Sequence, residues 1–194
     1  IGSGLVGSEM CIRDSTCTPQ GVLCVLKQFH YNIEEMLRDK APLFLLLENI
    51  QDPGNLGTML RTGEGAGVSG IIMSRDTVDL YNPKVIRSTM GSIYRVPFYY
   101  ADDFAAAVHQ VQQAGVSVYA AHLRGKNSYA CQDYTKGTAF LIGNEGNGLR
   151  EETAELADCY IRIPMEGKVE SLNAAVASSI LMYEAHRQRA TIEK

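Results

Sequence analysis

The chain has 194 residues, a mass of 21.3 kDa and a formal net charge of −4 at pH 7. Hydrophobic residues make up 45% of it and charged residues 21%, a balance typical of a globular chain of about one domain. This composition excludes a wholly disordered or fibrous protein, and the acidic charge argues against a uniformly basic nucleic-acid coat protein, although a local basic site stays open.

Cysteine and histidine spacing gives no sign of a disulfide framework or a metal site. The five cysteines stand at positions 11, 17, 24, 131 and 159, and no two of them form a C-x-x-C pair. We therefore expect a reducing, cytoplasmic location, and no bound metal. The longest purely aliphatic and aromatic run, at residues 43–47, is far shorter than the roughly 20 residues that span a bilayer, so we expect no membrane association.

The first 42 residues differ in character from the rest. Residues 1–15 (IGSGLVGSEMCIRDS) have no helical or strand period and no initiating methionine, and we interpret them as a non-native leader. Residues 16–42 are interpreted as a linker or remnant that precedes the main domain. Within them, Asn32 is a candidate helix cap, because Glu35 three residues later completes a capping-box pattern.

From residue 43 onward, short apolar strands alternate with helices. Strands are predicted at 43–48, 69–74, 95–100, 116–123, 138–143 and 159–164. Helices are predicted at 55–66, from Pro83 with Asn82 as its cap, from a cap at Asp102 to residue 114, at 149–157, and at 171–187 with Ser171 as a candidate cap. The strands are apolar throughout, which suits burial on both faces. The pattern predicts an α/β fold with a mainly parallel sheet flanked by helices.

Polar and glycine-rich segments follow three of these strands. They are NIQDPGNLG (49–57), GNEGNGL (143–149), and IPMEG (163–167) followed by SLN (171–173). Each alone is an ordinary turn, but ligands of open α/β sheets bind beyond the carboxyl ends of the strands, where all three would meet. Arg61, on the second turn of its predicted helix, adds a guanidinium suited to phosphate recognition.

The same segments resemble a known family. NIQDPGNLGTMLRT, FLIGNEGNGL and IRIPMEGKVESLNAAVASSI are similar, in order, to the three motifs of the SpoU (TrmH-like) branch of the SPOUT RNA methyltransferases. The intervening VIRSTMGSIYRVPF resembles the ribosomal-RNA members more than the transfer-RNA members. The resemblance implies a catalytic domain at residues 43–190 with a C-terminal deep trefoil knot, which works as a homodimer. It also implies methyl transfer from S-adenosylmethionine to a ribose 2′-hydroxyl, of large-subunit (23S) ribosomal RNA in preference to transfer RNA.

The resemblance also assigns residues to roles. By similarity, the cofactor lies against the backbone of Gly143, Ile163, Met165 and Leu172, with His122 and Leu123 lining the same cleft. The catalytic set implied by the motifs is Arg61, Asn55, Glu145, Ser171 and Asn173. Because a guanidinium stays protonated in proteins, Arg61 is expected to bind a phosphate and stabilise developing alkoxide charge rather than act as a base. Glu145 is expected either to hold Arg61 or an amide in place, or to contact RNA.

Several alternatives stay open. The family usually carries a separate N-terminal RNA-binding domain, which is not recognisable before residue 43, so a non-catalytic RNA-binding module is one alternative and a transfer-RNA methyltransferase is another. A nucleotide-dependent oxidoreductase would need G-x-G-x-x-G after the first strand, where this chain has DPGNLG. Arg87 and Arg95 are read either as a phosphate-facing patch or as solvated charge, and Tyr94 either as packing or as a base-stacking ring. Apolar side chains of the last helix face either a dimer partner or the core of the monomer; they are Leu172, Val176, Ile180 and Tyr183.

Overall fold

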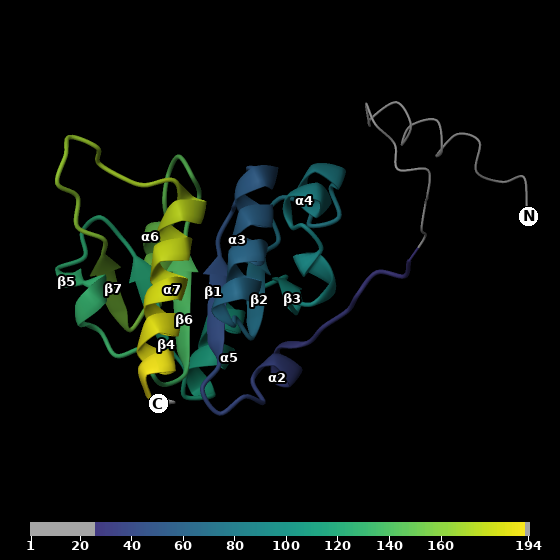
Figure 1. Ribbon diagram of the computed structural model, residues 1–194, viewed down its shortest axis with the longest axis horizontal. Coiled ribbons are helices and arrows are strands. Elements are labelled where there is room, and N and C mark those ends of the chain that lie inside the picture. The colour runs from purple at the N-terminus through teal and green to yellow at the C-terminus, as the bar shows by residue number, and fades with distance from the viewer. Residues whose placement is uncertain (1–25, 193–194) are drawn as a thin grey trace, which may run out of the picture.

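The computed structural model describes residues 26–192, so the leader expected at residues 1–15 lies outside the described residues. Within them, seven strands form one sheet in the order β3-β2-β1-β6-β4-β7-β5, and every neighbouring pair is parallel (Figure 1). The strands are β1 (Leu43–Leu47), β2 (Gly70–Ser74), β3 (Phe98–Ala101), β4 (Ser117–Ala121), β5 (Asn127–Ser128), β6 (Thr138–Ile142) and β7 (Cys159–Arg162). The predicted α/β fold with a mainly parallel sheet is confirmed.

Helices cover both faces of this sheet. They are α2 (Ile33–Met36), α3 (Pro53–Ala66), α4 (Pro83–Ser88), α5 (Phe104–Gln113), α6 (Glu151–Ala154) and α7 (Ala174–Ile192), with short 3₁₀ turns η1 (Ser92–Tyr94) and η2 (Tyr129–Cys131). In Figure 1, α3 and α7 lie side by side in front of the sheet and α5 lies behind it. The sheet is therefore the middle of three layers, as parallel sheets require.

The alternation of side chains along β1 explains the two-sided core. Leu45 and its odd-numbered neighbours pack with α3 and α7, whereas Phe44 and Leu46 pack with α2, α5 and α6. Every residue of β1, β2 and β6 is buried, and all are apolar or glycine except Thr138 at the start of β6 and Ser74 at the end of β2. Strands β4 and β7, nearer the edge, expose part of their residues.

Helix ends follow local capping chemistry and correct three expectations. The Asn32 side chain accepts a hydrogen bond from the Glu35 N–H, which confirms the cap of α2. Asp103 rather than Asp102 caps α5, because its carboxylate accepts from the Ala106 N–H at 2.9 Å. The helix predicted at 149–157 is only the single turn of α6, and the last helix begins at Ala174 rather than at Ser171.

Chain direction in the sheet places the functional site. After β1 the chain moves outward through β2 and β3, then crosses to the other side of β1 to form β4, β6 and β7. Ligand crevices of open parallel sheets form where the direction of winding reverses, beyond the carboxyl ends of the strands. Here that point lies between β1 and β6, from which two of the three polar segments run.

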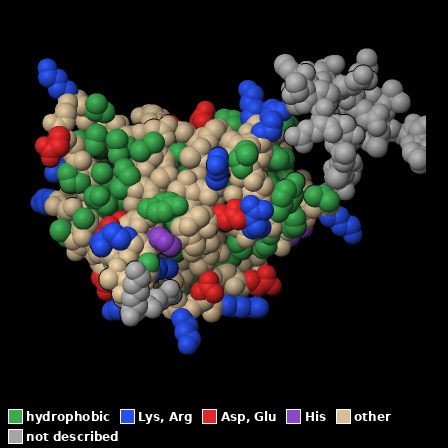
Figure 2. Space-filling view, viewed as in Figure 1, with side chains coloured by type: hydrophobic (Ala, Val, Ile, Leu, Met, Phe, Trp, Pro, Cys, Tyr) green, Lys and Arg blue, Asp and Glu red, His purple; other side chains and the backbone are tan. Residues whose placement is uncertain are grey.

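The described part of the chain has neither a membrane span nor a metal cluster, and its surface is mixed in charge. Acidic and basic side chains are interspersed over the face drawn in Figure 2, in keeping with the modest net charge. Among residues 26–192, no helix is both long enough and apolar enough to cross a membrane, and no group of three or more His, Cys, Asp or Glu side chains is arranged to hold a metal ion.

Candidate functional site

Two adjoining pockets open at the carboxyl edge of the sheet. The first, which is the more enclosed of the two, has a volume of about 250 Å³ and lies between the loops that follow β4, β6 and β7. All six residues expected to hold the cofactor line it, namely His122, Leu123, Gly143, Ile163, Met165 and Leu172. The second, more open pocket is formed by the segment after β1, the segment after β6 and Asn173. The two pockets share the stretch 144–146, so a group bound in one would lie beside a group bound in the other.

The loop after β6 is shaped by hydrogen bonds to itself. Asn144 and Gly148 exchange backbone hydrogen bonds of 3.0 and 2.9 Å, and the Asn144 side chain accepts from the Gly146 and Asn147 N–H groups. A Cβ atom at Gly143 would come within 2.2 Å of the Gly148 carbonyl carbon. Gly143 is therefore required by the closure of the loop on itself, whatever binds beside it.

A chain of hydrogen bonds joins the three motifs at the open pocket. The Asn173 amide donates to Asn55 Oδ1 at 2.9 Å, and the Asn55 amide donates to Glu145 Oε1 at 3.0 Å. Glu145 also accepts from the backbone N–H groups of Gln51 and Asp52, at 3.1 and 3.0 Å. The carboxylate thus holds amides, as one of its two expected roles required, and it does not hold Arg61.

These hydrogen bonds fix the charge state of Glu145. Partial burial opposes ionisation, but the hydrogen bonds from Asn55, Asp52 and Gln51 outweigh it and hold the pKa of Glu145 below its ordinary value. The carboxylate is therefore charged at neutral pH and acts as an acceptor. In this state it orients the Asn55 side chain rather than donating a proton.

Asn173 also begins the last helix. Its side-chain oxygen accepts from the N–H groups of Ala175 and Val176, at 2.9 and 3.2 Å, which is the geometry of a helix N-cap. The amide oxygen of Asn173 therefore caps α7, while its amide nitrogen donates to Asn55. The start of α7 and the site network depend on the same side chain.

Arg61 and Ser171 lie outside this network. Arg61 stands on the third turn of α3 rather than on the expected second turn and lines neither pocket, and its side chain makes no hydrogen bond or ion pair with another described residue. Arg61 follows Asn55 by six residues in the helix. Its side chain therefore points about 240° around the helix axis from that of Asn55 and lies about 9 Å further along the axis. Ser171 lines the more enclosed pocket and is exposed.

His122 forms one wall of the more enclosed pocket. Its ring stacks on Tyr160, with centroids 5.2 Å apart, and its Nδ1 atom accepts from the Arg124 N–H at 3.1 Å. Burial, and then the charge of Arg124, lower the pKa of His122, while Glu151 opposes this effect. The neutral ring is thus the form that the folded site favours at neutral pH.

Sequence reasoning missed an ionic clamp beneath the site. The buried Glu48 carboxylate accepts from the Arg150 N–H at 2.8 Å and from the Thr153 hydroxyl, and the Arg150 guanidinium reaches on to Asp76 at 2.5 Å. The clamp ties the end of the loop after β6 to the ends of β1 and β2. No motif marked it, because its members are far apart in the sequence and individually ordinary.

Comparisons with known proteins agree with this geometry. A sequence model of the SpoU rRNA Methylase family matches residues 42–183. The chain is 36% identical over 168 residues to the Bacillus subtilis 23S rRNA (guanosine(2553)-2′-O)-methyltransferase RlmP, covering 87% of this chain and 65% of that protein. Among solved structures, it matches the SpoU methyltransferase AviRb from Streptomyces viridochromogenes, in complex with the cofactor AdoMet, with a TM-score of 0.77, 31% identity and coverage of 82% and 62%.

A second solved structure gives the same likeness. The AdoMet-bound rRNA methyltransferase from Sinorhizobium meliloti aligns with a TM-score of 0.75 and 37% identity, covering 83% of this chain and 62% of that one. The chain thus spans a little under two thirds of the length of these relatives.

Proposed function

Because the chain belongs to the SpoU rRNA methylase family, we propose that it is an RNA methyltransferase that acts on a ribose 2′-hydroxyl with S-adenosylmethionine as its methyl donor. The observation that carries the proposal is the hydrogen-bonded set Asn55, Glu145 and Asn173 at an open pocket directly beside a second, largely apolar one. This arrangement offers one place for a cofactor and an adjoining place for a nucleotide.

The more enclosed pocket fits S-adenosylmethionine. Leu123, Ile163 and Leu172 supply apolar walls, and the irregular stretches 143–149 and 163–172 present backbone groups to a polar ligand. The bound cofactor supplies an electrophilic methyl group. The remaining task of the protein is chiefly alignment, since a 2′-oxygen must be held behind that methyl group in a productive direction.

The chain's own residues divide this task. Glu145 fixes Asn55, and Asn173 fixes it from the other side, so a polar side chain is held rigidly at the mouth of the open pocket. Ser171 lines the more enclosed pocket. For Arg61 we propose binding of the phosphate next to the methylated ribose and stabilisation of the developing alkoxide, because an exposed guanidinium is free to meet RNA.

The substrate we propose is ribosomal RNA, of the large subunit (23S) in particular, in preference to transfer RNA. The 23S rRNA methyltransferase activity named for RlmP and the segment at residues 85–98 both support this assignment. We place the reaction in the cytoplasm, the methyltransferase domain at residues 43–190 and a linker at 16–42.

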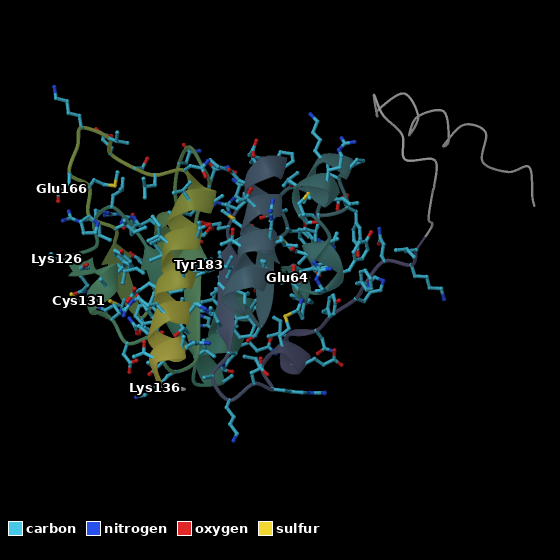
Figure 3. All side chains as sticks on the ribbon, viewed as in Figure 1. Glu64, Lys126, Cys131, Lys136, Glu166 and Tyr183 are labelled. Carbon is cyan, nitrogen blue, oxygen red and sulfur yellow. The ribbon has the colours of Figure 1, made fainter. Side chains whose placement is uncertain are left out.

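We also propose that the C-terminal segment is knotted and that the protein is a homodimer. The knot is supported by the stretches before and after β7, which together line one pocket. The dimer is supported by an apolar stripe on α7, where Val176 is 48% and Tyr183 50% exposed, and Ile180 is partly exposed between them. Figure 3 shows Tyr183 on the face that α7 and α3 turn away from the sheet. Leu172, the fourth apolar position, lies at the pocket instead.

Calorimetric titration with S-adenosylmethionine tests the cofactor assignment. We expect micromolar binding to the full chain, no binding of NADH, and loss of binding when Gly143→Val closes the loop against its own backbone. A folded protein, shown by a cooperative heat-capacity transition, that binds no S-adenosylmethionine would overturn the proposal.

A further inference from the structure

The corner formed by α4 and the turn after it lies beside the open pocket. We define the α4 corner by Lys84, Arg87, Met90 and Tyr94. The Ser88 hydroxyl at the end of α4 is 3.2 Å from the Pro53 carbonyl oxygen, and Pro53 lines the open pocket. The helices meet closely because position 57 is glycine, where a Cβ atom would lie 1.7 Å from Ser88 Oγ. Anything bound on the α4 corner would thus adjoin the site.

The α4 corner carries two uncompensated positive charges. Lys84 and Arg87 are three residues apart on one helix, hence on the same side of it, and both are exposed. Neither forms an ion pair with another described residue, whereas the nearby Arg95 is held by both carboxylate oxygens of Glu64. In Figure 2, basic side chains project together above α4. Arg87 and Arg95 are the two arginines of the possible phosphate-facing patch. Because Arg95 is paired with Glu64, only Arg87 has a guanidinium that is free to bind a phosphate.

Two apolar side chains are exposed in the turn that follows α4. Met90 is 69% exposed on a backbone with φ of 50°, and Tyr94 is 50% exposed. The Tyr94 ring meets the edge of Phe29, with centroids 6.0 Å apart and planes at 73°, so its position is braced from one side. A braced aromatic ring and free cations on the preceding helix are the groups that bind unpaired bases and their phosphates.

We propose that the α4 corner binds the single-stranded RNA that flanks the methylated nucleotide. Arg87 and Lys84 contact backbone phosphates, and Tyr94 stacks on an unpaired base. This inference rests on the proposed function, because the corner matters only if RNA enters the adjoining pocket. A double helix is disfavoured as occupant, since its base faces are already stacked and cannot lie on Tyr94.

Salt-dependent binding of a model RNA tests the inference. Fluorescence anisotropy would follow binding of labelled rU12, and of an RNA duplex of equal length, to the full chain at several salt concentrations. We expect Lys84→Gln/Arg87→Gln to weaken rU12 binding and to reduce the slope of log K against log[salt] by about 1.4, or 0.7 for each lost single-strand phosphate contact. The matched control is Lys40→Gln/Lys136→Gln, which removes two exposed charges at the opposite edge of the sheet (Lys136 in Figure 3) and should leave the slope unchanged.

A second pair of variants tests the stacking. Tyr94→Ala should weaken rU12 binding about 5- to 100-fold, whereas Tyr94→Phe, which keeps the ring, should bind as the parent does. S-adenosylmethionine binding by calorimetry should be unchanged in all of these variants. An unchanged salt slope in the double variant, tighter binding of the duplex than of rU12, or no rU12 binding by the parent would each overturn the inference. In those cases, intact S-adenosylmethionine binding and methyl transfer would show that the proposed function itself stands.

Discussion

Asn173 allows the roles of a helix cap and a site residue to be separated by experiment. Its oxygen caps α7 through the Ala175 and Val176 N–H groups, and its amide nitrogen donates to Asn55 at 2.9 Å. Asn173→Ala removes both functions. Asn173→Asp keeps the capping oxygen but turns the donor toward Asn55 into an acceptor.

The two variants should differ in stability. Loss of an N-cap costs about 1 kcal/mol, with a range of about 0.5–2, so Asn173→Ala should lower Tm by roughly 2–4 °C for each kcal/mol in a chain of this size. Aspartate is as good a cap as asparagine, and its charge suits a helix N-terminus, so Asn173→Asp should unfold near the parent temperature. Ala190→Gly, exposed near the end of α7, is a control that weakens the helix far from the site.

Activity should follow a different order. In Asn173→Asp two acceptors face each other, and Asn55 can relieve this only by turning its amide away from Glu145. We expect methyl transfer to fall about 10- to 100-fold in both Asn173 variants, as for loss of about 1.4–3 kcal/mol of orientation, and to change little in Ala190→Gly. Scanning calorimetry and incorporation of labelled methyl groups into ribosomal RNA give the two readouts. Full activity of Asn173→Asp, or its destabilisation to the level of Asn173→Ala, would refute this reasoning.

Three further variants probe other parts of the structure. Arg189 donates hydrogen bonds to four backbone carbonyls at the lower end of the sheet. Arg189→Met should therefore lower the free energy of unfolding in urea by about 2–5 kcal/mol, whereas Arg187→Gln should lower it by no more than about 0.5 kcal/mol. Equal effects of the two substitutions would contradict this. Because burial lowers the pKa of His122, the neutral ring prevails at neutral pH and the protonated ring forms only as the pH falls below the ordinary pKa of 6.5. The affinity for S-adenosylmethionine should therefore decline in this acidic range in the parent and stay constant in His122→Asn. Parallel pH profiles of the two proteins would show that His122 is not responsible. If the proposed homodimer packs through α7, Tyr183→Glu should sediment as a monomer, whereas the parent and Lys136→Glu should sediment as dimers. A dimeric Tyr183→Glu would place the interface elsewhere.

The alternation of apolar strands and helices predicts the α/β fold and its mainly parallel sheet, but it gives six strands and leaves out β5, because Asn127 and Ser128 are two polar residues with no hydrophobic run. The strands of the sheet centre are buried on both faces, so hydrophobic runs marked them clearly, and β1, β2 and β6 lie within a residue of their predicted bounds. The helix starts were less predictable, because Asp102 and Asp103 are adjacent and both are good caps. Only the local backbone decides that Asp103 accepts the hydrogen bond while Asp102 pairs with Arg75.

The sequence predicts where the candidate site lies in the sheet, but only part of how its side chains are hydrogen-bonded to one another. Motif order brought Asn55, Glu145 and Asn173 to one edge, but no sequence pattern indicates that a single amide would join two of them in a chain. The Arg150 clamp was beyond reach for the same reason, since its partners come from the ends of separate strands. Arg61 shows the opposite case, where a motif residue stands on an exposed helix face away from both pockets.

Analysis of the methylated nucleoside tests the central claim most directly. The full chain would be incubated with labelled S-adenosylmethionine and ribosomal RNA, and the RNA then digested to nucleosides and separated, with Asn173→Asp as the matched control. We expect the label in a 2′-O-methylated nucleoside with the parent protein and at least about tenfold less with the variant. Label on a base instead of the ribose, or no label in RNA from a protein that binds S-adenosylmethionine, would contradict the assignment.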